Sequence, residues 1–282
     1  MSSVPFYAKR FISGTNMQEA LEVVKELNRK NLSASLDVLG ENIKNSSDCY
    51  KFTQEYIQLL EQIEGQKLKS HVSVKLTMLG LDLDRDLCEH NITQILKAAD
   101  AFRNRVAFDM EGTPYTDRTL DMYFKMAKMF KSPEIVLQAY LHRTPADLKK
   151  VLEIGGRFRL CKGAYKENSN VALQDMASIR KQYLSLIDLA LTSGQRICIA
   201  SHDDEVIKHC KQKIKAENID KERYEFQMLY GMRKKTWEDI AKEGHNMTVY
   251  VPYGTDWQAY YSRRLMERKE NVFFVVKNLF KS

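Results

Sequence analysis

Apolar stretches of strand length alternate with helical patterns along most of the chain. In SASLDVLG (33–40) every second residue is apolar, and Ser35 and Asp37 face the opposite side, which is the two-residue period of a β-strand. A helical pattern follows this strand, and another precedes it at about 15–30. The same alternation predicts further strands, each with a helical pattern after it, at 72–79, 106–111, 135–141, 157–164, 196–201, 224–229 and 248–254.

Eight strand and helix pairs in succession predict an α/β fold, a closed (β/α)8 barrel or TIM barrel. No linker rich in Pro, Gly and Ser divides the chain, so we expect one barrel domain at 33–282, preceded by a helical segment at 1–32. A doubly wound sheet is the competing fold. It often has a Gly-rich phosphate-binding turn, and neither G-x-G-x-x-G nor G-x-x-x-x-G-K-[ST] occurs in this sequence. In a barrel, catalytic groups lie at the carboxyl ends of the strands.

Several predicted strands carry polar residues on the side that would face the barrel interior. Lys75, Asp109 and Gln138 lie on that side, Tyr250 lies near the end of another strand, and His202 follows a strand. Buried ionisable groups are costly unless they are paired or bind a ligand, so this set suggests a site. The alternative for Lys75 and Asp109 is a structural pair in the barrel interior. His202 by itself is more often a hydrogen-bonded structural residue.

The stretch RLCKGAY (159–165) combines two cations with a glycine. Arg159 and Lys162 have opposite parity in a regular strand, so they reach a common ligand only if the strand ends or bends near Gly163. Such a bend would present both cations, free backbone N–H groups and the ring of Tyr165. These groups suit an anionic, aromatic cofactor, meaning a nucleotide or a flavin.

A charged helix follows the last predicted strand. Tyr260, Arg263, Arg264 and Glu267 share one of its faces, because they are spaced by three and four residues. A solvated surface is the ordinary explanation of such a face. However, two adjacent guanidinium groups also match the oxygens of a small carboxylate, and in Arg263 and Glu267 the acid follows the base, which is the weaker order for a helix-stabilising pair.

Composition narrows the class of protein without choosing a partner. The net charge of +7 arises from 44 basic and 37 acidic residues and suggests an anionic ligand, a membrane surface or nucleic acid. Five cysteines without a C-x-x-C spacing indicate reduced thiols and no metal site. The chain has no apolar run of membrane-spanning length and its start does not resemble a signal peptide, so we expect a cytoplasmic protein.

The sequence resembles the proline dehydrogenase family, in particular its short, single-domain bacterial members. The motifs that carry the resemblance, in order, are KLT (75–77), DME (109–111), QAY (138–140), RLCKGAY (159–165), SH (201–202), EFQMLYGM (225–232), VYVPYG (249–254) and YYSRRLME (260–267). The resemblance implies a distorted barrel with noncovalent FAD and a last helix over the barrel mouth. It also implies oxidation of L-proline to Δ1-pyrroline-5-carboxylate by hydride transfer to N5 of the flavin, with electrons passing to a membrane quinone.

The resemblance also implies substrate contacts. Arg263 and Arg264 would hold the proline carboxylate, Glu267 would orient Arg263, and Lys75 would complete the anion site. The residues implied to surround the pyrrolidine ring are Tyr250, Tyr260 and Leu229, with Asp109 close to them.

The implied cofactor contacts come from other strands. The residues implied to contact FAD are Gln138, Arg159, Lys162, Gly163, Ala164, Tyr165 and His202, with Arg159 near N5 of the flavin. Two positions depart from the family pattern. Lys166 stands where longer members often have an aromatic residue against the adenine, and Cys161 replaces an aliphatic residue.

Two other classes of function stay open at the level of sequence. A Schiff-base lyase on the same barrel could use Lys75 or Lys162 as its amine nucleophile. A basic nucleic-acid-binding protein is less favoured, because the lysines are interleaved with acids and no binding motif occurs. The stretch VFFVVKNLF (272–280) is a candidate for peripheral contact with a membrane surface, although a last helix packed on the barrel is the simpler interpretation.

Overall fold

Eight parallel strands close into a barrel. A computed structural model describes residues 4–5, 7–40 and 43–266. Its strands are β1 (Ser33–Val38), β2 (Ser70–Val74), β3 (Val106–Phe108), β4 (Pro133–Gln138), β5 (Arg157–Cys161), β6 (Ile197–Ala200), β7 (Tyr224–Leu229) and β8 (Met247–Tyr253). Each strand pairs with the next in sequence, and β8 pairs in parallel with β1. The prediction of a (β/α)8 barrel is therefore confirmed.

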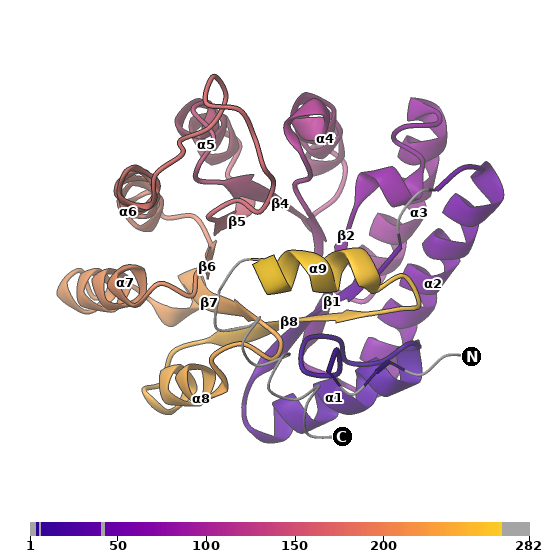
Figure 1. Ribbon diagram of the computed structural model, residues 1–282, viewed down its shortest axis with the longest axis horizontal. Helices are drawn as coiled ribbons and strands as arrows, with labels where there is room; N and C mark the ends of the chain where they lie inside the picture. The colour runs from indigo at the N-terminus through magenta and orange to yellow at the C-terminus, as the bar shows by residue number, and fades with distance from the viewer. Residues whose placement is uncertain (1–3, 6, 41–42, 267–282) are drawn as a thin grey trace.

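Helices alternate with the strands along the sequence (Figure 1). They are α1 (Met17–Arg29), α2 (Ser46–Gly65), α3 (Arg85–Ala101), α4 (Thr113–Ala127), α5 (Thr144–Glu153), α6 (Met176–Thr192), α7 (Asp204–Ala216), α8 (Lys234–Lys242) and α9 (Gln258–Met266), with 3-10 turns η1 (Leu76–Leu79) and η2 (Lys221–Arg223). Among the described residues, no helix combines the length and the apolar character that a membrane crossing requires.

The helix before the first strand takes the place that the helix after the last strand has in a regular barrel. α1 has an apolar stripe formed by Ala20, Leu21, Val24 and Leu27, and it packs on the outside of β1 and β8. It therefore occupies the gap between α8 and α2 (Figure 1). The outer face of β8 is thus already covered, and α9 instead crosses the mouth of the barrel, the end formed by the carboxyl ends of the strands (Figure 1).

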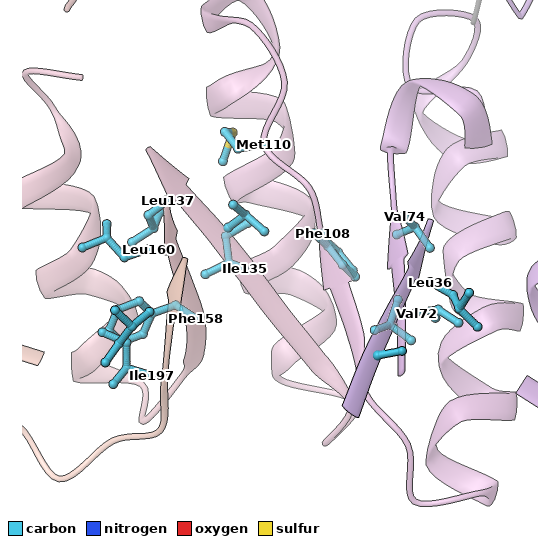
Figure 2. Close-up of a cluster of buried hydrophobic side chains, with 14 of the residues drawn as sticks. Leu36, Val72, Val74, Phe108, Met110, Ile135, Leu137, Phe158, Leu160 and Ile197 are labelled. Atoms are coloured by element: carbon cyan, nitrogen blue, oxygen red, sulfur yellow. The ribbon is translucent and has the colours of Figure 1, made fainter. Parts of the chain in front are cut away.

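The main hydrophobic core lies between the strands and the helices. The side chains that point outward from the strands, such as Leu36, Val72, Phe108 and Phe158, are fully buried against the helices (Figure 2). Alternation along each strand then directs the other set of side chains into the barrel. That inner set is largely polar, and the expectation of inward-facing Lys75, Asp109 and Gln138 follows from the same alternation.

Several predicted strands run past the ends of the observed ones, which lie at Val38, Val74, Phe108, Gln138 and Cys161. The run at 72–79 leaves the sheet after Val74, and Lys75 then opens η1. The run at 106–111 pairs only as far as Phe108. The polar residues at these positions end strand pairing early and turn toward the mouth of the barrel, so the strand period alone overestimated both lengths.

The amino-terminal end of the barrel interior holds a separate cluster of charges. Arg105 donates to Glu134 at 2.9 Å and to Glu225 at 3.0 Å, and Arg196 donates to Glu225 at 3.1 Å. His71 accepts from Arg105 through Nδ1 at 3.2 Å, and its pKa lies well below the usual value because of burial and of the neighbouring guanidinium. Glu225 therefore belongs to a structural network at the end opposite to the mouth.

Replacement of Glu225 by Gln tests this network. Burial opposes ionisation of Glu225, but Arg105 and Arg196 outweigh burial and lower its pKa. The stabilisation is therefore complete above the unfolded-state pKa of about 4.3 and is lost as the pH falls below that value toward the lower native pKa. We expect Glu225→Gln to reduce the free energy of unfolding at pH 7 by about 3 kcal/mol, measured in urea, and the difference from the wild type to shrink below about pH 4.

The control for this measurement is Glu22→Gln, which removes an exposed partner of Lys25 and should have little effect at either pH. A loss for Glu225→Gln that is the same at pH 7 and at pH 3.5, or no loss at all, would contradict the assignment.

Candidate active site

A cavity of about 750 Å3 opens at the mouth of the barrel, beneath α9. Its volume lies in the upper part of the range of small-molecule sites. Every predicted site residue within the described part of the chain lines it, namely Lys75, Asp109, Gln138, Arg159, Lys162, Gly163, Ala164, Tyr165, His202, Leu229, Tyr250, Tyr260, Arg263 and Arg264. Glu267 lies outside the described residues. The cavity therefore brings together side chains from strands far apart in the sequence.

Lys75 is held by a carboxylate that sequence reasoning did not include in the site. Its Nζ donates to both carboxylate oxygens of Asp37, at 2.6 and 2.7 Å, and lies 3.9 Å from Asp109. Burial acts to lower the pKa of Lys75, but the two carboxylates outweigh burial and raise it. For the fully buried Asp37, burial raises the pKa and the Lys75 ammonium opposes that rise. The shared inward face of Ser35 and Asp37 was the signal that could have identified this partner.

Asp109 joins two other side chains of the cavity. One carboxylate oxygen accepts from Nη1 of Arg159 at 2.8 Å, and the other accepts from the Tyr250 hydroxyl at 2.6 Å. Burial and the Asp109 charge raise the pKa of Tyr250 well above its usual value. Tyr250 is therefore a neutral donor, and Asp109 fixes both of its neighbours in place.

Arg159 is anchored from below by two serines. Its Nη2 donates to Ser35 at 3.1 Å and to Ser73 at 3.0 Å, and only 4% of the residue is exposed. Its Nε is buried and has no hydrogen-bond partner among the described residues. A buried cationic donor without a partner is costly, so this atom suits an acceptor on a bound ligand.

The chain bends at the end of β5. The opposite parity of Arg159 and Lys162 required such a bend for the two cations to reach a common ligand. The strand stops at Cys161, and Gly163 adopts a φ of +117°. A Cβ at Gly163 would lie 2.2 Å from the Tyr140 ring, so the chain can pass this point only as glycine. The turn brings Lys162 and Arg159 to the same cavity.

The arginines of α9 cover the cavity from above. Arg264 is 6% exposed, and its guanidinium lies over the Tyr260 ring at 5.1 Å, while Arg263 is half-buried. Tyr260 belongs to an apolar cluster that also contains Phe11, Trp257 and Tyr261. The α9 face is therefore part of a pocket, which excludes the interpretation of a fully solvated helix surface.

Two further predicted cofactor residues, His202 and Gln138, form hydrogen bonds with backbone groups. The backbone N–H of Leu229 donates to Nε2 of His202 at 3.1 Å, so this ring nitrogen is an acceptor and the ring hydrogen lies on Nδ1. Gln138 donates to the backbone oxygen of Glu111 at 3.0 Å. Both side chains thus combine a structural contact with a place on the cavity wall.

These contacts weigh against Schiff-base chemistry at Lys75. An amine nucleophile must lose its proton, and an ion pair with Asp37 and a raised pKa hold Lys75 in the ammonium form. The arrangement instead favours binding of an anionic ligand by fixed cations, next to a wall of tyrosine and leucine side chains.

The fold and the cavity define a (β/α)8-barrel protein with a cation-rich cavity at the barrel mouth. The family model described as "Proline dehydrogenase" matches residues 20–277, and the chain belongs to the proline dehydrogenase family. The chain is 40% identical over 274 residues to proline dehydrogenase 2 of Bacillus subtilis (strain 168), which covers 97% of this chain and 90% of that protein. It is 34% identical to proline dehydrogenase of Deinococcus radiodurans, over 97% of this chain and 90% of that protein.

A solved structure has a similar fold. Proline utilization A from Bdellovibrio bacteriovorus, inactivated by N-propargylglycine, superposes with a TM-score of 0.85 at 25% sequence identity. The superposition covers 93% of this chain and 32% of that longer chain.

The ion pair of Lys75 predicts low reactivity toward amine reagents. In the wild type we expect acetic anhydride at pH 8.5 to modify Lys75 more slowly than the exposed Lys51, as measured by peptide mass spectrometry. Asp37→Asn removes the main charge partner without opening the site, so Lys75 should then react at least about tenfold faster, because one unit of pKa changes the free amine about tenfold. An unchanged rate for Lys75 in Asp37→Asn would contradict the role of Asp37, and Lys51 serves as the internal reference in both proteins.

Proposed function

We propose that this protein oxidises L-proline to Δ1-pyrroline-5-carboxylate with FAD as its cofactor. The observation that carries the proposal is the pair of arginines on α9, held over a cavity whose floor contains Lys75 and Arg159. Membership of the proline dehydrogenase family supports the choice of substrate.

In this proposal α9 and Lys75 bind the substrate carboxylate. Arg263 and Arg264 supply planar donors that match carboxylate oxygens, and Lys75 adds a third cation. Glu267, which follows Arg263 by four residues in the sequence, would orient the Arg263 side chain. Fixing the carboxylate limits the orientations of the ring, which lowers the entropic cost of reaching the reactive geometry.

The apolar part of the substrate would meet the other side of the cavity. Tyr250, Tyr260 and Leu229 line the cavity, and Leu229 and Tyr250 pack against the apolar cluster that contains Tyr260. These side chains would enclose the pyrrolidine ring and exclude water from it. Both oxygens of Asp109 already accept hydrogen bonds, so Asp109 would keep Arg159 and Tyr250 in position during the reaction.

The residues of the cavity fit a flavin. The buried Nε of Arg159 needs an acceptor, the turn at Gly163 brings backbone close to the cavity, and Lys162 and His202 lie on the same wall. These residues, with Gln138, Ala164 and Tyr165, would hold FAD. When bound, FAD would supply the acceptor for the hydride of proline at its N5 position. Arg159 would stabilise negative charge on that side of the ring, and the arginine pair would place the substrate against it.

The acceptor of the electrons is proposed to be a membrane quinone. The excess of basic residues favours contact with an anionic membrane surface, and such contact would be peripheral. On this proposal the protein works in the cytoplasm, at times on the inner face of the cell membrane. The stretch 272–280, the candidate for that contact, lies outside the described residues.

The visible spectrum tests the cofactor. The purified protein should be yellow, with a flavin absorbance band that L-proline bleaches in the absence of oxygen. D-proline is the matched control, since it presents the same groups with the carboxylate on the wrong side of the ring, and it should bleach the band far more slowly. A colourless protein that gains no flavin band after incubation with FAD would overturn the proposal.

Replacement of Arg264 tests the carboxylate site. Arg264→Met keeps much of the side-chain volume and removes the charge, so we expect kcat/KM for proline to fall about 100-fold, mainly through KM, with FAD retained. Arg29→Met changes an exposed arginine at the end of α1 and should leave the kinetics unchanged. Wild-type proline kinetics in Arg264→Met would contradict the assignment.

A further inference from the structure

The loop between β5 and α6, residues 162–175, forms one wall of the cavity without regular secondary structure. Its first four residues, Lys162 to Tyr165, all line the cavity. The loop is fixed at its two ends. At the start, Tyr140 donates through its backbone N–H to Lys162 at 2.9 Å, and near the far end the N–H of Leu173 donates to Tyr140 at 2.8 Å.

The middle of this loop is attached to a different part of the barrel by Glu167. Its carboxylate accepts the backbone N–H of Thr113 at 2.8 Å through one oxygen and the Thr113 hydroxyl at 2.6 Å through the other. Thr113 opens α4, so the contact joins the wall formed by β5 to the connection between β3 and α4. The two residues are 54 positions apart in the sequence.

The start of α4 needs this contact. The residue before the helix is Gly112, which has no side chain to accept a hydrogen bond, and Pro114 has no N–H to donate. The N–H of Tyr115 already donates to the backbone oxygen of Gly112 at 2.9 Å. The N–H of Thr113 is therefore the donor that requires an acceptor from elsewhere, and a carboxylate at a helix amino terminus also interacts favourably with the helix dipole.

Residues that neighbour the Glu167–Thr113 contact on either side line the cavity. Tyr165, two residues before Glu167, has a ring atom 4.0 Å from the position of a Cβ on Gly112, and Tyr165 lines the cavity. On the other side, the backbone oxygen of Glu111 accepts from Gln138, which also lines the cavity. Residues 111–113 thus contact Gln138 on one side and, through Glu167, the loop that carries Tyr165.

We propose that Glu167 is a positioning residue for flavin binding: it fastens the Lys162–Tyr165 wall to the start of α4 and so sets the distance between that wall and Gln138. This assignment rests on the proposed function. Glu167 itself does not line the cavity, so it acts through Tyr165 and its neighbours. The contact orders the loop before the ligand binds, and ordering in advance increases affinity because less conformational entropy is lost on binding.

The test compares three variants in two measurements. Glu167→Ala removes both acceptors. Glu167→Gln keeps an acceptor for the Thr113 N–H and offers a donor to the Thr113 hydroxyl. Asp84→Ala is the matched control, because Asp84 is also a carboxylate that accepts N–H groups at a helix amino terminus, that of α3, and it does not line the cavity. The measurements are amide hydrogen exchange of peptides spanning 162–171 in the flavin-free protein, and the Kd for FAD from quenching of its fluorescence.

We expect Glu167→Ala to exchange faster in this loop and to bind FAD about tenfold more weakly, the size of effect that loss of a charge-assisted hydrogen bond gives. Glu167→Gln should recover most of both properties, and Asp84→Ala should match the wild type in both. Wild-type exchange or wild-type FAD affinity in Glu167→Ala would overturn the proposal, as would an equal loss in Asp84→Ala. A wild-type protein that binds no FAD would instead overturn the proposed function, while the exchange rates would still decide whether Glu167 holds the loop.

Discussion

Burial of charge inside the barrel is the constraint on which the rest of this structure depends. A charged side chain away from water is tolerated only when partners compensate for the lost hydration. The barrel meets this requirement in two clusters. At the amino-terminal end Arg105 and Arg196 neutralise Glu134 and Glu225 through direct ion pairs. At the mouth Lys75 pairs with Asp37 and Arg159 pairs with Asp109, and Lys75, Arg159 and Asp109 also line the cavity beneath α9. The first cluster is therefore a structural network, and only the second lines the cavity beneath α9, where a ligand could meet it.

The position of α1, where β8 meets β1, determines what covers the mouth of the barrel. α1 covers the outside of β1 and β8, so the helix that follows β8 is free to cross the mouth and to bring Arg263 and Arg264 over the cavity. Residues before α1 then support this helix. The rings of Tyr7 and Phe11 lie with their centroids 5.6 and 6.2 Å from that of Tyr261. The two ends of the described chain therefore cooperate in one structure, and the position of the arginines depends on packing that begins at the amino terminus.

Local patterns predicted the elements of the fold but not all of their limits. The two-residue and three-to-four-residue periods are properties of neighbouring residues, so eight strands with helices between them were recognisable from the order of residues alone. The limits at 72–79 and 106–111 were wrong, because pairing between strands decides where a strand ends. Asp37 was missed for a similar reason: its contact with Lys75 joins different strands. The bend at Gly163 was predictable, since the opposite parity of Arg159 and Lys162 required it for a common ligand.

The sequence by itself determined the fold class, the inward face of several strands and, through its motifs, the family. These follow from periodicity and from short residue patterns, which act over a few positions. Only the tertiary structure decided which charges neutralise each other. It placed Glu225 in a network remote from the mouth, paired Lys75 with Asp37, and brought Glu167 to the start of α4. Such contacts depend on the register and closure of the barrel, because the three-dimensional neighbours of a buried charge come from strands and loops that lie far apart in the sequence.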